Sequence, residues 1–139
     1  MPSSKTVTIL LIEDDDVDVK ALRWAFDKLK IANPLLVARD GVEAWGMLAA
    51  LPRPYLIITD ISMPRMNGIE FLRKLRESEE FCDSIVFVLT TSNDEQDKID
   101  AYHLNVAGYM LKSDMGTSFT RAIALIENYW KVVEFPGPD

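Results

Sequence analysis

The chain has 139 residues, enough for one domain with one good core but not for two. Apolar residues make up 48% and charged residues 27%, as in soluble globular domains, and no apolar run approaches the roughly 20 residues that cross a bilayer. A net charge of −7 and a pI near 4.7 argue against direct binding to nucleic acid, because phosphate backbones are also negative.

The N-terminal segment MPSSKTVT lacks the apolar region of a signal peptide. The single cysteine, Cys82, cannot form an internal disulfide, and no Cys/His cluster suggests zinc. Both observations indicate a cytoplasmic protein.

Five short apolar runs, separated by segments with helical periodicity, follow one another along the chain. The runs lie at residues 7–12, 35–38, 56–59, 85–90 and 108–111. They are continuously apolar rather than alternating, as parallel strands covered on both faces are. Predicted helices lie at 17–30, at 42–51, at 69–78, from a cap at Asn93 or Asp94 to residue 104, and at 117–133. This alternation predicts a doubly wound α/β fold with a five-stranded parallel sheet and five helices.

Chemically active side chains follow four of these five strands. Glu13 and Asp14 follow the first strand and Asp60 follows the third. Thr90 ends the fourth strand, and Lys112 follows the fifth. Because doubly wound sheets bind ligands beyond the carboxyl ends of their strands, we expect these side chains to share one site.

Such a set suits phosphoryl chemistry. Three carboxylates resist joint ionisation, and a hard divalent cation such as Mg²⁺ relieves their repulsion. A carboxylate beside the metal can become an aspartyl phosphate, with Lys112 neutralising charge and Thr90 donating a hydroxyl. Each residue taken alone is more often a turn former or a solvated charge, but their joint placement favours function. We assign Asp15, Asp16 and Asp18 only to the helix start, where acids suit the helix dipole.

Four segments resemble the motifs of response-regulator receiver domains: ILLIEDD, IITDISMPRMNGIEFL, VFVLTTS and AGYMLK. The resemblance covers residues 6–131 and implies a flavodoxin-like strand order 2-1-3-4-5, within one receiver domain over residues 1–139 that ends in a tail at 132–139. It implies a protein that is not an enzyme, accepts a phosphoryl group from a sensor histidine kinase and signals through protein–protein contacts.

The resemblance also implies roles for individual residues. The phosphoacceptor would be Asp60. The Mg²⁺ ligands would be Glu13, Asp14, Asp60 and the backbone carbonyl of Ser62. The phosphate-contacting and switch residues would be Thr90, Lys112 and Tyr109.

One position departs from the receiver pattern. Many receivers carry a proline in a cis bond after the lysine, whereas Ser113 follows Lys112 here. A cis bond before serine would cost about 2.5–4 kcal/mol, so we expect a trans bond and a loop of different shape.

The last predicted helix carries two apolar stripes. The stripe expected in the core is Phe119, Ile123, Ile126 and Trp130. The second stripe is Leu125, Tyr129 and Val132, with Phe135 beyond the helix. A helix that covers a sheet normally needs one apolar face, so the second stripe predicts a homodimer interface. The long helix and its EFP tail are similar to stand-alone regulators that work with bacterial phytochrome-type histidine kinases.

Four alternative functions fit less well. A phosphohydrolase of the haloacid-dehalogenase type needs D-x-D-x-T/V after the first strand, which residues 14–18 do not supply. A calcium loop starting at Asp14 would need Gly and Glu where Val19 and Ala25 stand. Acids at the phosphate site disfavour a flavodoxin-like electron carrier, and the full set of acids, hydroxyl and lysine disfavours a binding-only pseudo-receiver.

Overall fold

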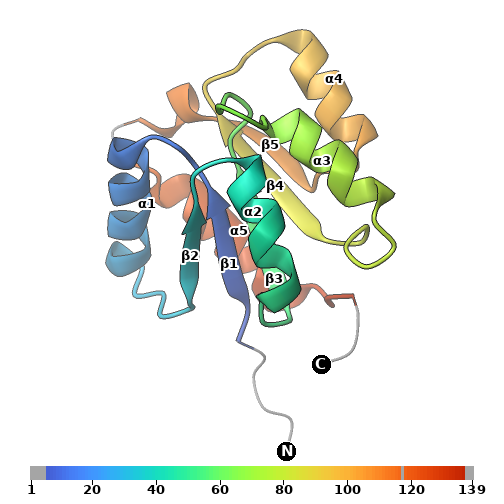
Figure 1. The fold of residues 1–139 in the computed structure, drawn as a ribbon. Coiled ribbons are helices and arrows are strands. Elements are labelled where there is room, and N and C mark those ends of the chain that lie inside the picture. Colours follow the sequence, from blue (N-terminus) through green and yellow to red (C-terminus); the bar gives the residue numbers. More distant parts are fainter. Residues whose placement is uncertain (1–5, 117, 137–139) are drawn as a thin grey trace, which may run out of the picture.

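A sheet of five parallel strands lies at the centre of the computed structural model, which describes residues 6–116 and 118–136 (Figure 1). The strands are β1 (Thr8–Ile12), β2 (Leu35–Ala38), β3 (Tyr55–Thr59), β4 (Ile85–Thr90) and β5 (Gly108–Leu111). Their order is β2-β1-β3-β4-β5, and every pairing is parallel. The predicted fold class and strand order are therefore confirmed.

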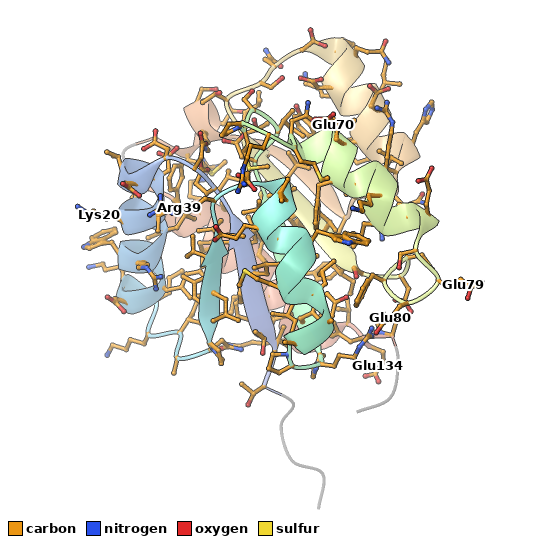
Figure 2. The ribbon with its side chains drawn as sticks, in the orientation of Figure 1. Lys20, Arg39, Glu70, Glu79, Glu80 and Glu134 are labelled. Atoms are coloured by element: carbon orange, nitrogen blue, oxygen red, sulfur yellow. The ribbon has the colours of Figure 1, made fainter. Side chains whose placement is uncertain are left out.

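Five α-helices cover the two faces of this sheet. They are α1 (Asp16–Lys28), α2 (Gly41–Met47), α3 (Gly68–Glu77), α4 (Glu95–His103) and α5 (Thr120–Val132). The helices α1 and α5 pack together on one face, and α2, α3 and α4 lie side by side on the other (Figure 1). Charged side chains such as Lys20 extend outward from the helices (Figure 2). No helix within these described residues has both the length and the apolar character that crossing a bilayer would require.

The strands are apolar throughout because each face of the sheet has its own core. On β1, Leu10 packs with residues of α2 and α3, whereas Ile9 and Leu11 pack with residues of α1 and α5. The same alternation holds on β4, where Val86 and Phe87 belong to different clusters. Successive side chains of a strand point to opposite faces, so a sheet covered twice has no polar side.

Two predicted helices differ in extent from the observed ones. The helix predicted at 42–51 is α2 followed by a 3₁₀ turn, η1 (Leu48–Ala50). Leu51 is extended because the residue before a proline, here Pro52, disfavours helical backbone. After β5 a second 3₁₀ turn, η2 (Lys112–Met115), precedes α5. The predicted start of the last helix at 117 lies outside the described residues, as do residues 1–5 and 137–139 of the predicted domain and tail.

Candidate functional site

Strand register brings the predicted site residues together at the carboxyl end of the sheet. Ile12 of β1 pairs with Thr59 of β3, so the next residues, Glu13 and Asp60, are neighbours. The backbone N–H of Asp60 donates to the carbonyl of Ile12 at 3.0 Å and extends the ladder by one step. β4 pairs with β3, and β5 pairs with β4 so that Thr90 lies opposite Leu111. The ends of these two strands therefore reach the same edge of the sheet. The sequence expectation of one shared edge is thus met by the backbone alone.

Asp60 lies at the centre of this edge and is almost fully buried. Its Oδ1 accepts hydrogen bonds from the backbone N–H of Ile61 at 2.6 Å and from Thr90 Oγ1 at 2.5 Å. A longer contact of 3.4 Å joins Oδ1 to the N–H of Ser62. Its Oδ2 faces the Lys112 ammonium at 3.0 Å. Donors thus hold both oxygens of one carboxylate, which fixes the orientation of the group.

Lys112 reaches this carboxylate although no proline follows it. The cis peptide bond of the described residues lies at Arg53–Pro54, so the Lys112–Ser113 bond is trans, as expected. The Lys112 side chain is only 8% exposed, yet its ammonium contacts three carboxylates. Burial alone would lower the pKa of Lys112, but its hydrogen bonds to Asp18 and Glu13 and the charge of Asp60 outweigh burial and raise that pKa above its ordinary value.

Glu13 is the most deeply buried acid of the site. Its side chain is 2% exposed, and its Oε1 accepts from Lys112 Nζ at 2.7 Å. Burial raises the pKa of Glu13 from 4.5 to about 7; the Lys112 hydrogen bond opposes this rise, and the negative charge of Asp60 adds to it. The carboxylate therefore lacks sufficient positive charge nearby for its degree of burial.

Glu13, Asp14 and Asp60 form a group that suits a divalent cation. Each offers a carboxylate oxygen, and these oxygens lie within 4.8 Å of one another. Asp14 is exposed while the other two are buried, so the group is open to solvent on one side. All three donors are hard oxygens, which favour Mg²⁺, Mn²⁺ or Ca²⁺ over softer metals. The raised pKa of Glu13 is the electrostatic sign of the same shortage of positive charge.

Thr90 and Tyr109 are linked through Ser92. Thr90 is fully buried, and its Oγ1 also accepts from the backbone N–H of Ser92 at 3.2 Å. The phenol of Tyr109 donates to the carbonyl of Ser92 at 2.9 Å. A chain of hydrogen bonds therefore runs from Asp60 to the half-buried Tyr109 on β5. The sequence pattern does not mark Ser92, which stands two residues after Thr90 in VFVLTTS.

The loop between β3 and α3 is fixed by close backbone contacts. A Cβ on Gly68 would lie 2.2 Å from the carbonyl oxygen of Asp60, so only glycine fits there. Arg65 Nε donates to Asp40 Oδ2 at 2.6 Å, and the N–H of Gly41 donates to the carbonyl of Met66 at 3.0 Å. These bonds tie the loop that follows Asp60 to the loop that follows β2.

Asp18 belongs to this site, whereas the sequence predicts only a place at the helix start, where acids suit the helix dipole. Its Oδ2 lies 2.6 Å from Lys112 Nζ, across a sequence separation of 94 residues. By contrast, Asp15 serves as the cap of α1, accepting from the N–H of Val17 at 2.8 Å, and Asp16 pairs with Arg39 at the surface. No local pattern separates Asp18 from these neighbouring acids.

The two stripes predicted on α5 differ in their surroundings. The first is buried, as expected: Phe119, Ile123, Ile126 and Trp130. In the second, Leu125 is 54% and Val132 80% exposed. Tyr129 packs edge-on against Phe87 of β4 with ring centres 5.0 Å apart, and Phe135 packs against the same core. Half of the second stripe is therefore partly covered within the domain.

Comparison with known proteins agrees with this geometry. The family model of the response regulator receiver domain matches residues 9–124. The chain belongs to the response regulator receiver family. The response regulator Rcp1 of Synechocystis is 31% identical over 134 residues, which cover 92% of this chain and 91% of Rcp1.

Two solved receiver structures are also similar over most of their length. The Mn²⁺-bound form of Rcp1 has a TM-score of 0.82 at 31% identity and covers 94% of this chain and 99% of its own. The phosphorylated cyanobacterial phytochrome response regulator RcpA has a TM-score of 0.84 at 26% identity and covers 96% of this chain and all of its own (100%). This receiver is therefore a signalling protein of a two-component phosphorelay, in which a histidine kinase supplies the phosphoryl group.

Proposed function

We propose that this receiver accepts the phosphoryl group on Asp60. The observation that carries the proposal is the convergence of donors on one buried carboxylate: Lys112 on Oδ2, and Thr90 and the Ile61 N–H on Oδ1. The same donors would neutralise the oxygens of a transferred phosphoryl group, whose chemistry depends mainly on positioning and charge stabilisation.

In this mechanism an oxygen of Asp60 bonds to phosphorus while the P–N bond of a phosphohistidine on the kinase breaks. The imidazole nitrogen keeps the electron pair of that bond. The Ile61 and Thr90 hydrogen bonds hold the attacking carboxylate in one orientation. Lys112 places a positive charge beside the oxygens that gain negative charge.

We infer that the metal is Mg²⁺, held by Glu13, Asp14, Asp60 and the backbone carbonyl of Ser62. The carboxylate oxygens of the first three are close enough to share one ion, and Ser62 directly follows Ile61 in the fixed loop. When bound, the ion supplies charge neutralisation for the carboxylates and for the phosphoryl oxygens. The Mn²⁺ in the Rcp1 structure supports a divalent ion in this family.

Thr90 and Tyr109 would form the switch. We infer that Thr90 exchanges its bond to Asp60 for one to the phosphoryl group, which strains the link through Ser92 to Tyr109. The surface of α4 and β5 would then change as a shift between two packings, because phosphate binds one packing better.

The partner we propose is a sensor histidine kinase of the phytochrome type in the cytoplasm. RcpA is a phytochrome response regulator, and this chain shares its fold over nearly its whole length. Direct binding to nucleic acid is not part of the proposal, because the net charge is −7.

We also propose a homodimer formed through α5 and the tail. Leu125 and Val132 are the exposed apolar residues of this surface, with Tyr129 and Phe135 beside them, half-buried. A two-fold contact lets the same patch serve both copies.

The phosphoacceptor is tested by labelling with acetyl phosphate and Mg²⁺. We expect one acid-stable, alkali-labile phosphoryl group on the wild type and none on Asp60→Asn. Asp27→Asn, an exposed acid on α1, is the matched control and should label fully. Stoichiometric labelling of Asp60→Asn at another residue would refute the assignment.

A further inference from the structure

Asp18 gives Lys112 a carboxylate partner from outside both the phosphoacceptor and the metal-binding group. The ammonium contacts Asp18 at 2.6 Å, Glu13 at 2.7 Å and Asp60 at 3.0 Å. Asp18 lies in the first turn of α1, and its carboxylate does not belong to the group formed by Glu13, Asp14 and Asp60.

The three contacts use the full donor capacity of the lysine. An ammonium carries three N–H bonds, and each points to one carboxylate here. A phosphoryl group on Asp60 can gain a hydrogen bond from Lys112 in addition to the existing contact with Asp60 only if Glu13 or Asp18 is released. The state of the site before phosphorylation therefore already includes a competitor for the ammonium.

Asp18 is the partner best suited to be exchanged. Its side chain is 22% exposed, whereas those of Glu13 and Asp60 are 2% and 7% exposed, so water can solvate only Asp18 well after release. Within the described residues Lys112 is also the only side chain that donates to Asp18. Glu13, by contrast, accepts a second bond from the N–H of Asp15 at 3.2 Å.

We propose that Asp18 is a positioning residue that holds Lys112 before phosphorylation and competes with the phosphoryl group for its ammonium. This inference rests on the proposed role of Asp60 as phosphoacceptor. Removing the Asp18 carboxylate frees one N–H of Lys112 for the phosphoryl oxygens. The affinity of Asp60 for a phosphoryl-like anion then rises rather than falls.

Beryllium trifluoride, an anion that mimics a phosphoryl group on a carboxylate, tests this at saturating Mg²⁺. By calorimetric titration we expect Asp18→Asn to bind it about fivefold to tenfold more tightly than the wild type, because Lys112 no longer divides its charged hydrogen bonds with Asp18. In a Lys112→Met background the same substitution should give no gain, because a competitor needs its lysine.

Two further variants separate competition from other effects. Asp16→Asn removes the same charge two residues away, where the acid pairs with Arg39 at the surface, and should change affinity less than about twofold. Asp18→Glu keeps the carboxylate and should retain wild-type affinity.

Weaker binding by Asp18→Asn would overturn the inference, because Asp18 would then support phosphoryl binding. A gain that persists with Lys112→Met would also overturn it. If the wild type does not bind the anion, or if Asp60→Asn binds it equally well, the proposed phosphoacceptor itself fails, and this inference fails with it.

Discussion

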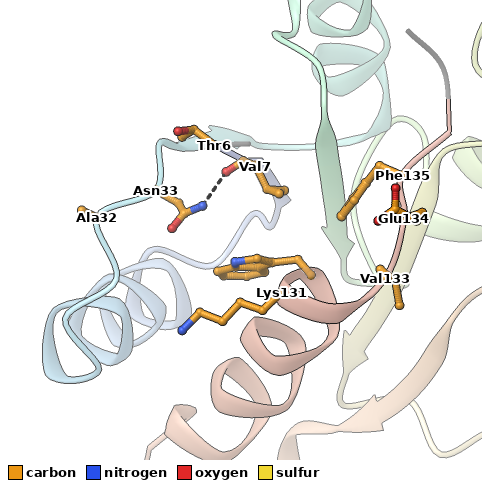
Figure 3. A pocket seen from close by; sticks show the side chains of 9 residues that line it. Thr6, Val7, Ala32, Asn33, Lys131, Val133, Glu134 and Phe135 are labelled. Atoms are coloured by element: carbon orange, nitrogen blue, oxygen red, sulfur yellow. Dashed lines mark hydrogen bonds between the residues drawn. The ribbon is translucent and has the colours of Figure 1, made fainter. Parts of the chain in front are cut away.

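The two ends of the sheet differ in the side chains that they bring together. At the carboxyl end, four acids and one lysine share a small space, and hydrogen bonds hold the buried groups in place. At the amino end, a hollow of about 630 Å³ lies between the start of β1 and the end of α5. Its lining includes Trp130 and Phe135, and Asn33 donates to the carbonyl of Val7 at 2.9 Å (Figure 3).

The two ends also differ in the chemistry of their side chains. The hollow offers room, but no group of acids with metal-ligand spacing lies among its described lining residues. The carboxyl end has buried charges whose pKa values are shifted, and perturbed titratable groups cluster at functional sites. We therefore expect substitutions at the amino end to change stability without changing phosphoryl binding, and those at the carboxyl end to change phosphoryl binding together with the dependence of stability on metal and pH.

The largest effect should come from Trp130→Ala at the amino end. Trp130 is 8% exposed and packs near Phe26 of α1 with ring centres 6.5 Å apart. Its truncation should lower the free energy of unfolding by about 3–5 kcal/mol. Urea denaturation measures this, and acetyl phosphate labelling of the folded variant should match the wild type. A labelling defect in fully folded protein would break the proposed separation between the two ends.

In the presence of a chelator, Lys112→Met should lower the free energy of unfolding by about 2–4 kcal/mol, because it leaves buried carboxylates without their cation. Added Mg²⁺ should restore much of this loss. Lys131→Met is the control, since Lys131 pairs with Glu127 at the surface and its loss should cost less than about 1 kcal/mol. Equal effects of the two substitutions, each indifferent to Mg²⁺, would show that the charges at the carboxyl end are not coupled.

The pH dependence of stability should sharpen the role of Glu13. Folding raises the pKa of Glu13 from 4.5 to about 7, so the folded state binds this proton more tightly than the unfolded state. Its contribution to stability is therefore complete below pH 4.5 and is lost as pH rises to about 7. Denaturation in a chelator should show this decline in the wild type but not in Glu13→Gln, and Mg²⁺ should reduce it. If the wild type and Glu13→Gln lose stability in parallel as pH rises, Glu13 is not the group whose pKa folding raises.

The smallest predicted effect is on dimer formation, through the exposed residues of the second apolar stripe on α5. Leu125→Asp should weaken the proposed homodimer by about 1–2 kcal/mol, because it buries a charge in an apolar contact. Val42→Asp, at a 44% exposed position on α2, is the control and should leave the dimer intact. Light scattering over a concentration series measures both. A wild type that stays monomeric at high micromolar concentration would exclude the dimer.

The sequence predicted the strands well because each strand is covered on both faces. Continuous apolar runs bounded by polar residues leave little choice of register, and the positions of Asp60, Thr90 and Lys112 follow from the strand ends. The residues that directly follow parallel strands lie together at the carboxyl edge of the sheet.

Long-range contacts were harder to predict. Asp18 and Lys112 are 94 residues apart, and the local pattern shows only an acid in the first turn of a helix. Similarly, the period of α5 shows that Tyr129 lies on a second stripe, but not that Phe87 of β4 covers its ring. Both contacts depend on the exact position in which each helix packs on the sheet, and the periodicity of apolar residues does not determine that position.

The central claim is that Asp60 carries the phosphoryl group. Borohydride reduction of protein treated with acetyl phosphate and Mg²⁺ converts an acyl phosphate to an alcohol, and peptide mass spectrometry then locates the modified residue. We predict reduction at Asp60, prevented by a chelator and unchanged by Asp27→Asn. Reduction at Asp14, Glu13 or any other acid, with Asp60 intact, would contradict the account.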